Sequence, residues 1–223
     1  SQFTAQLCCF LSLLLFSSVS QGQVERGGKP SWDADLSVVP KLRLSGIDRD
    51  LLNSQDAVTD QYKEAPWRFG VEFDVDIDLE ANGLWSMESG ERVWRMQIES
   101  QEALGLSFFF DEFRLPKGGK LFIWNEDRTD FIGSFDHRNN KEWGTLAVGQ
   151  TVGASVIIEY HEPLAALFHA ELHISQVIHS YRSIHRYAEA LQNRGPYGNS
   201  GNCNINVNCP EGASWATESR SVA

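Results

Sequence analysis

Four histidines in the later part of the chain are the residues best suited to bind a transition metal, namely His169, His173, His179 and His185. Zinc sites in proteins combine His, Cys and carboxylate ligands that converge on one point. Only His169 and His173 are closely spaced, no cysteine lies near them, and the segment has the residue pattern of a strand. We therefore expect surface or partly buried histidines, and the sequence predicts neither a metal site nor a cofactor.

Two sets of carboxylates could serve calcium binding or glycoside hydrolysis. The acids from Asp74 to Glu80 offer the oxygen ligands that calcium prefers, but they alternate with apolar residues and so spread along one face of a strand. The acids that could form a glycosidase pair are Glu88, Glu91, Asp111 and Glu112. Nothing distinguishes these four from acids at a sheet edge, so we expect solvated side chains and assign no catalytic residue.

Two cysteines near the carboxyl end, Cys203 and Cys209, are candidates for disulfide bonds. Ile205 and Val207 alternate with asparagines between them, which predicts extended backbone. In an extended strand the two thiols would lie beyond disulfide range of each other. In an exported chain we expect both cysteines to be oxidised, with partners outside this sequence.

The amino-terminal residues have the pattern of a secretion signal. Leu7 to Val19 is almost entirely apolar and uncharged, which is too short for a bilayer span of about twenty residues but typical of a signal peptide. Small and polar residues follow up to Gly22, where we expect cleavage. The sequence thus predicts a signal peptide at residues 1–22, a secreted protein, and no stable membrane anchor. Cys8 and Cys9 would leave with the signal.

Composition excludes some classes of partner. Thirty acidic and nineteen basic residues give a net charge of -11. Proteins that bind nucleic acid present a basic surface to the phosphates, so we expect no nucleic-acid partner. The apolar fraction of 42% is sufficient for a packed core.

A half-buried strand is predicted at residues 69–80. Phe69, Val71, Phe73 and the apolar residues that follow at every second position share one face, and acids occupy the other. This period of two is typical of β-structure. The further predicted strands cover residues 92–99, 105–115, 120–124, 130–135, 143–148, 154–160 and 170–181.

Gly, Asn and Pro turns separate these short runs, with no helical stretch between them, which predicts an antiparallel β-sandwich at residues 67–185. Residues 23–66 are polar and mixed, and we expect a linker with an edge strand at residues 36–44. A short helix is predicted at residues 183–192. The loop composition of residues 195–201 indicates an accessible linker.

The segment from Gly198 to Gly212 contains the pattern Gly-x-Ser-Gly-x-Cys-x5-Cys-Pro-Glu-Gly. It resembles the start of the mature domain of the bacterial lysyl endopeptidases, which are secreted, trypsin-like serine proteases with a chymotrypsin-type double β-barrel. The preceding region resembles, more loosely, the β-rich pro-region of such proteases, through residues 92–94, 115–118, 121–127 and 159–163.

The resemblance implies that the chain is the amino-terminal part of a protease precursor. The sandwich would be a pro-domain, residues 186–197 a processing linker, and residues 198–223 the truncated start of the protease, with Gly198 as the mature amino terminus. Cys203 and Cys209 would bond to downstream cysteines, and the catalytic triad would also lie downstream. The implied partners are the chain's own protease domain and the protein substrates of the complete enzyme.

Two alternatives stay open. Tyr197 precedes Gly198 and the nearest base is Arg194, so either another protease performs the maturation or the specificity of the enzyme is not lysyl. The second alternative is an exported sandwich that binds glycan or protein without protease activity. The aromatic residues that could form its binding face are Trp85, Trp94, Trp124 and Trp143.

Overall fold

Two β-sheets make up most of the protein. The structure is a computed structural model that describes residues 27–60 and 66–184. The strands of these residues are β1 (Lys41–Arg43), β2 (Gly70–Asp78), β3 (Leu84–Glu88), β4 (Glu91–Glu99), β5 (Gly105–Arg114), β6 (Lys120–Asn125), β7 (Phe131–Phe135), β8 (Leu146–Val152), β9 (Ser155–Pro163) and β10 (Glu171–Ser180). The helices are α2 (Arg49–Thr59) and two short 3-10 turns, η1 (Leu36–Val38) and η2 (His137–Asn139).

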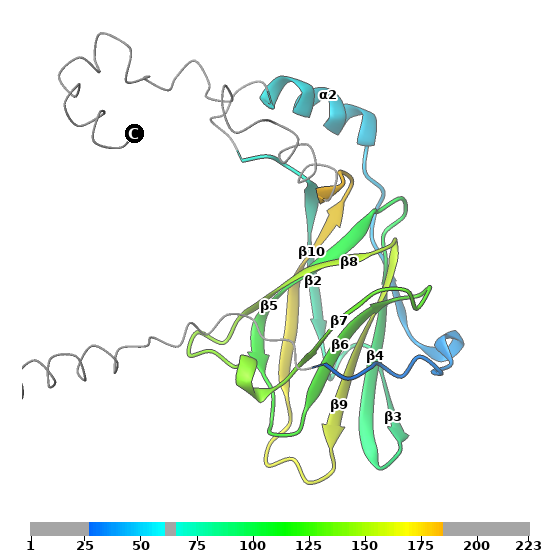
Figure 1. The fold of residues 1–223 in the computed structure, drawn as a ribbon, viewed down its shortest axis with the longest axis vertical. Coiled ribbons are helices and arrows are strands. Elements are labelled where there is room, and N and C mark those ends of the chain that lie inside the picture. Colours follow the sequence, from blue (N-terminus) through cyan, green and yellow to red (C-terminus); the bar gives the residue numbers. More distant parts are fainter. Residues whose placement is uncertain (1–26, 61–65, 185–223) are drawn as a thin grey trace, which may run out of the picture.

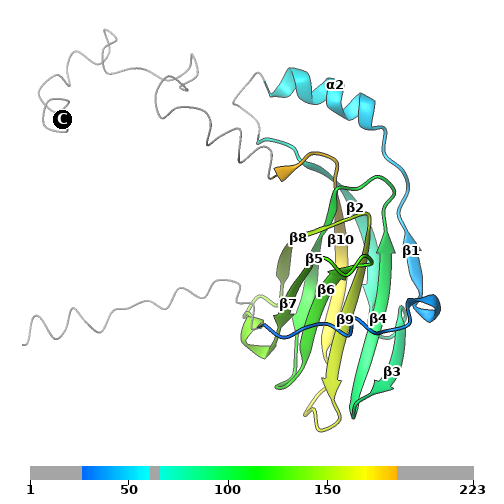
Figure 2. The same cartoon turned by 45° about the vertical axis from the view of Figure 1, so that its right-hand side comes forward.

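The first sheet has the strand order β1-β4-β9-β6-β7, with β3 also paired to β4. Its pairs are antiparallel except one, because β1 runs parallel to β4 with Lys41 opposite Gln97. The second sheet has the order β2-β10-β5-β8 and is antiparallel throughout. Figures 1 and 2 show the two sheets as separate layers, with β2 and β10 behind β9 and β4.

One hydrophobic core lies between the two sheets. The first sheet contributes inward side chains such as Trp94, Ile98 and Ile158, and the second contributes Phe108 and Val177, all at most 2% exposed. Burying large aliphatic and aromatic side chains of this kind stabilises a domain by about 1.5–3 kcal/mol each. This shared core makes the two sheets a single packed unit.

The outer face of the first sheet is also covered. Phe122, Trp124 and Ile157 form a second apolar cluster there, against Trp32 and Leu36 from the amino-terminal segment. Residues 27–40 cross β7, β9 and β4, as the blue ribbon in Figures 1 and 2 shows. Backbone contacts fix the crossing, for example the Ser31 N–H donating to the Glu159 carboxylate at 2.8 Å. Burial on both faces explains why residues 121–124 of β6 form a continuous apolar run, and why residues 156–158 of β9 do so over a shorter stretch.

The sequence predictions for the strands are confirmed for the most part. β2 shows the predicted alternation, with Glu72, Asp74 and Asp76 exposed while Ile77 is buried. The other predicted strands correspond to β4 through β10, with ends shifted by a few residues. The short strand β3 was not predicted, and the parallel pair of β1 with β4 departs from a purely antiparallel arrangement.

The segment predicted as a linker with an edge strand contains more structure than expected. Its edge strand is present as β1, but residues 49–59 form the helix α2, which the apolar pattern does not reveal. Asp48 caps the helix by accepting a hydrogen bond from the Leu51 N–H at 2.9 Å. The predicted helix at residues 183–192 falls almost entirely outside the described residues. Among the residues that are described, no helix is long and apolar enough to cross a bilayer.

Candidate functional site

The most distinctive polar cluster holds α2 against one end of the sheets. We call this region the α2 end and define it as α2 together with residues 67–69 and 181–184. Figures 1 and 2 show α2 lying beyond the strands instead of on a sheet face. Its outward position agrees with its burial, because Asp56 is the one buried residue of the helix.

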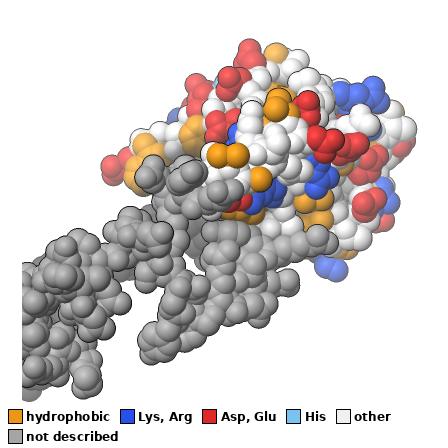
Figure 3. All heavy atoms as spheres, turned by 90° about the horizontal axis from the view of Figure 1, so that it is seen from above, with side chains coloured by type: hydrophobic (Ala, Val, Ile, Leu, Met, Phe, Trp, Pro, Cys, Tyr) orange, Lys and Arg blue, Asp and Glu red, His pale blue; other side chains and the backbone are white. Residues whose placement is uncertain are grey.

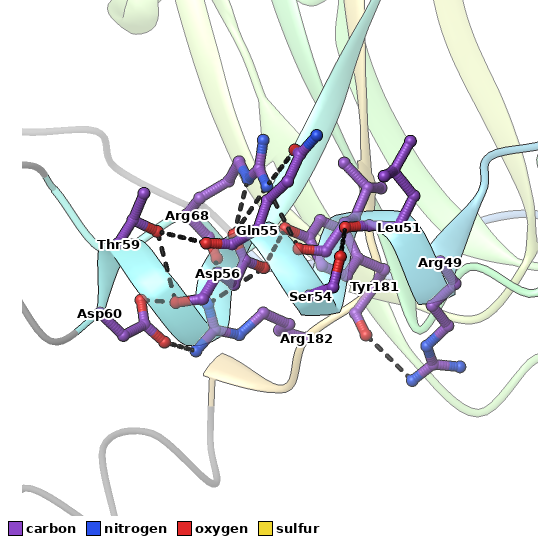
Figure 4. Close-up of polar contacts among 11 residues, drawn as sticks. Arg49, Leu51, Ser54, Gln55, Asp56, Thr59, Asp60, Arg68, Tyr181 and Arg182 are labelled. Atoms are coloured by element: carbon purple, nitrogen blue, oxygen red, sulfur yellow. Dashed lines mark hydrogen bonds and ion pairs between the residues drawn. The ribbon is translucent and has the colours of Figure 1, made fainter.

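Asp56 is the centre of the contacts that dock α2 (Figure 4). Its carboxylate is 3% exposed and accepts a hydrogen bond from the Tyr181 hydroxyl at 2.5 Å. The Arg68 guanidinium donates from Nε at 2.9 Å, and Arg182 Nη1 lies 3.3 Å from the second oxygen. Residues just before β2 and just after β10 thus bind one carboxylate of the helix, which joins the amino-terminal part of the domain to residues some 125 positions away.

Arg182 extends the cluster on the solvent side. Its guanidinium donates to the Asp60 carboxylate at 2.5 Å and lies over the Trp67 ring, 4.4 Å from the centroid. At the other end of α2, Arg49 donates to the Tyr181 carbonyl at 3.0 Å. Planar guanidinium groups suit both paired and stacked contacts, so both ends of the helix are attached to Tyr181 and Arg182.

The electrostatics of the cluster favour a charged Asp56. Burial alone would raise the pKa of the Asp56 carboxyl, but the hydrogen bonds from Tyr181 and Arg68 and the nearby positive charges outweigh it and hold the pKa below its ordinary value. Burial, followed by the hydrogen bond to Asp56, raises the pKa of the Tyr181 hydroxyl. The pair is therefore a neutral phenol that donates to a carboxylate.

Apolar side chains at this end are left uncovered by the described residues. Leu51 and Val58 of α2 are 53% and 58% exposed. A cleft of about 750 Å³ separates α2 from the sheet edge, and Leu104, Val152 and Ile184 contribute to its lining. Figure 3 views the molecule from this end and shows hydrophobic side chains lying among acidic and basic ones. The cleft combines apolar walls with the charged rim of Arg49 and Arg182, which is typical of a protein-binding surface.

The structure separates the acids considered for glycoside hydrolysis. Glu88 and Glu91 lie opposite each other on β3 and β4, whereas Asp111 lies on β5 of the other sheet and binds His173. Glu88 is paired with Arg95, and hydrogen bonds from that guanidinium lower the pKa of the Glu88 carboxyl to about 2. A carboxyl with so low a pKa is unsuited to act as a general acid near neutral pH.

The histidines make separate contacts. His169 lies 3.0 Å from Glu162, His173 bridges Asp76 and Asp111, and His179 contacts Ser100 at 2.6 Å. His185 lies outside the described residues, as do Gly198, Cys203 and Cys209. Within residues 27–60 and 66–184 no group of three potential ligands converges on one point.

The four tryptophans considered for a glycan-binding face also lie in separate surroundings. Trp94 and Trp124 are buried in the two apolar clusters. Trp85 is partly buried and packs against Tyr160 with ring centroids 6.1 Å apart. Trp143 is 71% exposed. The four rings therefore do not form a shared aromatic platform.

Sequence reasoning missed the residues of the α2 end. Asp56, Arg68 and Arg182 carry no motif, and each looks like an ordinary surface charge in the sequence. One signal was available, because Asp48 ahead of an acidic first turn is a common helix start. No such local signal predicts that Asp56 is buried, since two of its partners, Tyr181 and Arg182, come from the far end of the domain.

Comparison with known proteins does not assign the chain to a family. No family model matches it, and no solved structure matches it.

Proposed function

We propose that residues 67–184, with α2, form the β-sandwich pro-domain of a secreted serine endopeptidase precursor of the lysyl endopeptidase type. The motif from Gly198 to Gly212 supports the protease, and the apolar run at residues 7–19 supports export. The two facing sheets with one core support a domain that is complete without the downstream sequence. In this proposal the domain itself performs no catalysis.

The observation that carries the proposal is the position of Ile184 in the cleft beside α2. Only residues 185–197 separate Ile184 from Gly198. A protease domain that begins at Gly198 would therefore be tethered within about 50 Å of Ile184, a span that includes α2 with its exposed Leu51 and Val58. Because a short tether gives an effective concentration in the millimolar range, even a weak contact with this surface would be occupied in the uncleaved precursor.

Two roles follow for the pro-domain at this surface. By packing on the protease it would keep the active site from forming or from admitting substrate, and it would provide a template while the barrels fold. Cleavage between residues 195 and 201 would remove the tether, so that the two parts separate and the protease becomes active. The specificity would be for basic residues.

The experiment that tests the proposal begins with the coding sequence beyond Ala223. We expect a His-containing segment and, further on, Gly-Asp-Ser-Gly-Gly. The complete precursor is then produced with and without residues 27–184, and peptidase activity is measured after maturation. Equal yields of active enzyme from both forms would refute a folding role, and a downstream sequence without the triad would refute the protease assignment.

A second candidate function is a binding module for glycan or protein surfaces, and the exposure of Trp143 favours it. An exposed indole often contacts sugar rings or partner proteins. Retention of the secreted chain on insoluble polysaccharide, and its loss in W143A, would support this candidate. An unrelated or absent downstream domain would favour it over the protease precursor.

A further inference from the structure

A second cleft lies over strands β4, β9, β6 and β7 of the first sheet, and no residue of α2 lines it. It has a volume of about 690 Å³ and is formed where the amino-terminal segment meets the turn before β6 and the residues after β7. Three of its side chains are lysines from separate positions, Lys29, Lys117 and Lys120. All three are exposed, so their ammonium groups are accessible to a ligand.

The described residues do not neutralise these three lysines. Among the described residues no carboxylate forms an ion pair with any of them, whereas Lys41 pairs with Glu99 at 3.2 Å. Lys29 lies 5.8 Å from the centre of the Trp32 ring, a cation–π contact with a neutral group that leaves the net charge of the ammonium unchanged. The cleft therefore carries three free positive charges.

The acids of the cleft already have partners. The Asp136 carboxylate accepts from the Arg138 Nε at 3.0 Å and caps η2. The Glu91 carboxylate lies 3.3 Å from His161 Nδ1, and His161 Nε2 lies 2.7 Å from Glu159. Because both acids of the cleft are already engaged, the charges of the three lysines exceed the negative charge available to them in the cleft.

This local excess of positive charge stands out on a chain with a net charge of -11. Like charges gathered in a concave surface repel one another and focus a positive potential into it. A bound anion would relieve that repulsion. Gly28 and Gly118 line the cleft with φ of +97° and +92°, a backbone conformation that favours glycine.

We propose that this cleft binds a small polyanion that carries two or more phosphate or sulfate groups. Its volume lies in the range of small-ligand sites, about 300–1,000 Å³, and lysine binds such groups as a point charge. Phe122, which also lines the cleft, is 3% exposed and offers little ring surface to a ligand, so charge is the main basis of recognition. The site does not depend on the role of the α2 end.

The test is a calorimetric titration of the secreted chain with tripolyphosphate and, separately, with a sulfated disaccharide, at about 50 mM salt, where screening is weak. The variant K117Q/K120Q removes two charges from the cleft. Its control, K41Q/R43Q, removes two charges from β1. We expect K117Q/K120Q to weaken binding by about 10-fold or more and the control by about 2-fold or less.

The two titrations distinguish the anionic group that the cleft binds. Tighter binding of tripolyphosphate indicates phosphate, and tighter binding of the sulfated disaccharide indicates sulfate. Should K117Q/K120Q unfold, K29Q provides the same test from a different segment. Absence of binding to both probes, or equal weakening by the cleft and control variants, would overturn the proposal.

Discussion

Replacing Asp56 with Ala should release α2 from the sheets. The carboxylate is the common acceptor for Tyr181, Arg68 and Arg182, and it is the one buried side chain of the helix. The apolar residues Leu51 and Val58 are largely exposed and add little to docking. The attachment of α2 therefore depends on one carboxylate to an unusual degree.

The magnitude follows from the partners that D56A leaves behind. Tyr181 is 1% exposed, and a buried hydroxyl without an acceptor costs about 1–3 kcal/mol. The side chains of Arg68 and Arg182 are 40% and 21% exposed, so water replaces most of what they lose. Together these effects amount to about 2–4 kcal/mol, which overlaps the lower end of the range of about 3–5 kcal/mol for a broken buried ion pair and extends below it because both guanidinium groups are partly exposed.

Amide hydrogen exchange of α2 is the appropriate assay, because the loss falls on one local unit. In D56A the α2 amides should exchange about 30- to 1,000-fold faster, while the amides of β4, β9 and β10 keep their protection. D50N is the matched control, since Asp50 lies in the exposed first turn of the same helix. Unchanged protection of α2 in D56A would refute the central role of this carboxylate.

Further predictions concern the charged side chains of both sheets. The Glu159 carboxylate is fully buried and contacts Arg95, His161 and Ser31. The variant E159Q keeps the shape of this side chain but removes its charge, and it should lower the free energy of unfolding by about 3–5 kcal/mol in urea titrations. The control E126Q, at an exposed turn, should change that free energy by less than about 0.5 kcal/mol. The pKa of Glu88 is lowered from 4.5 to about 2, so the stabilisation that the charged Glu88 gives the fold is present above pH 4.5 and is lost as the pH falls toward 2. The difference in unfolding free energy between the parent and E88Q should therefore shrink between pH 4.5 and pH 2. A difference independent of pH would contradict this role of Glu88. Hydrogen bonds to Asp76 and, to a lesser extent, Asp111 raise the pKa of His173. The stabilisation that the charged His173 gives the fold is therefore present below pH 6.5 and is lost as the pH rises through the raised pKa. The melting temperature of H173A should approach that of the parent at alkaline pH, and a difference in melting temperature that widens there would contradict this role of His173.

The sequence by itself determined the local β-structure. The period-two pattern of residues 69–80 requires one apolar and one acidic face whatever the strand pairs with, and β2 shows both. Turn residues such as Pro116 and Gly118 separate β5 from β6 in the same local manner. The resemblance of residues 198–212 to protease sequences likewise comes from the sequence alone, and it remains a prediction because those residues lie outside the described part of the chain.

Tertiary structure alone decided which charges are buried. Glu159 occupies a position on β9 whose side chain would face solvent if the sheet were bare, and it is fully buried because residues 27–40 cross over it. Asp56 is buried because Tyr181, some 125 positions away, reaches its carboxylate. Local sequence patterns carry the period of a strand or the cap of a helix, but burial of a charge depends on segments that meet only when the chain has folded.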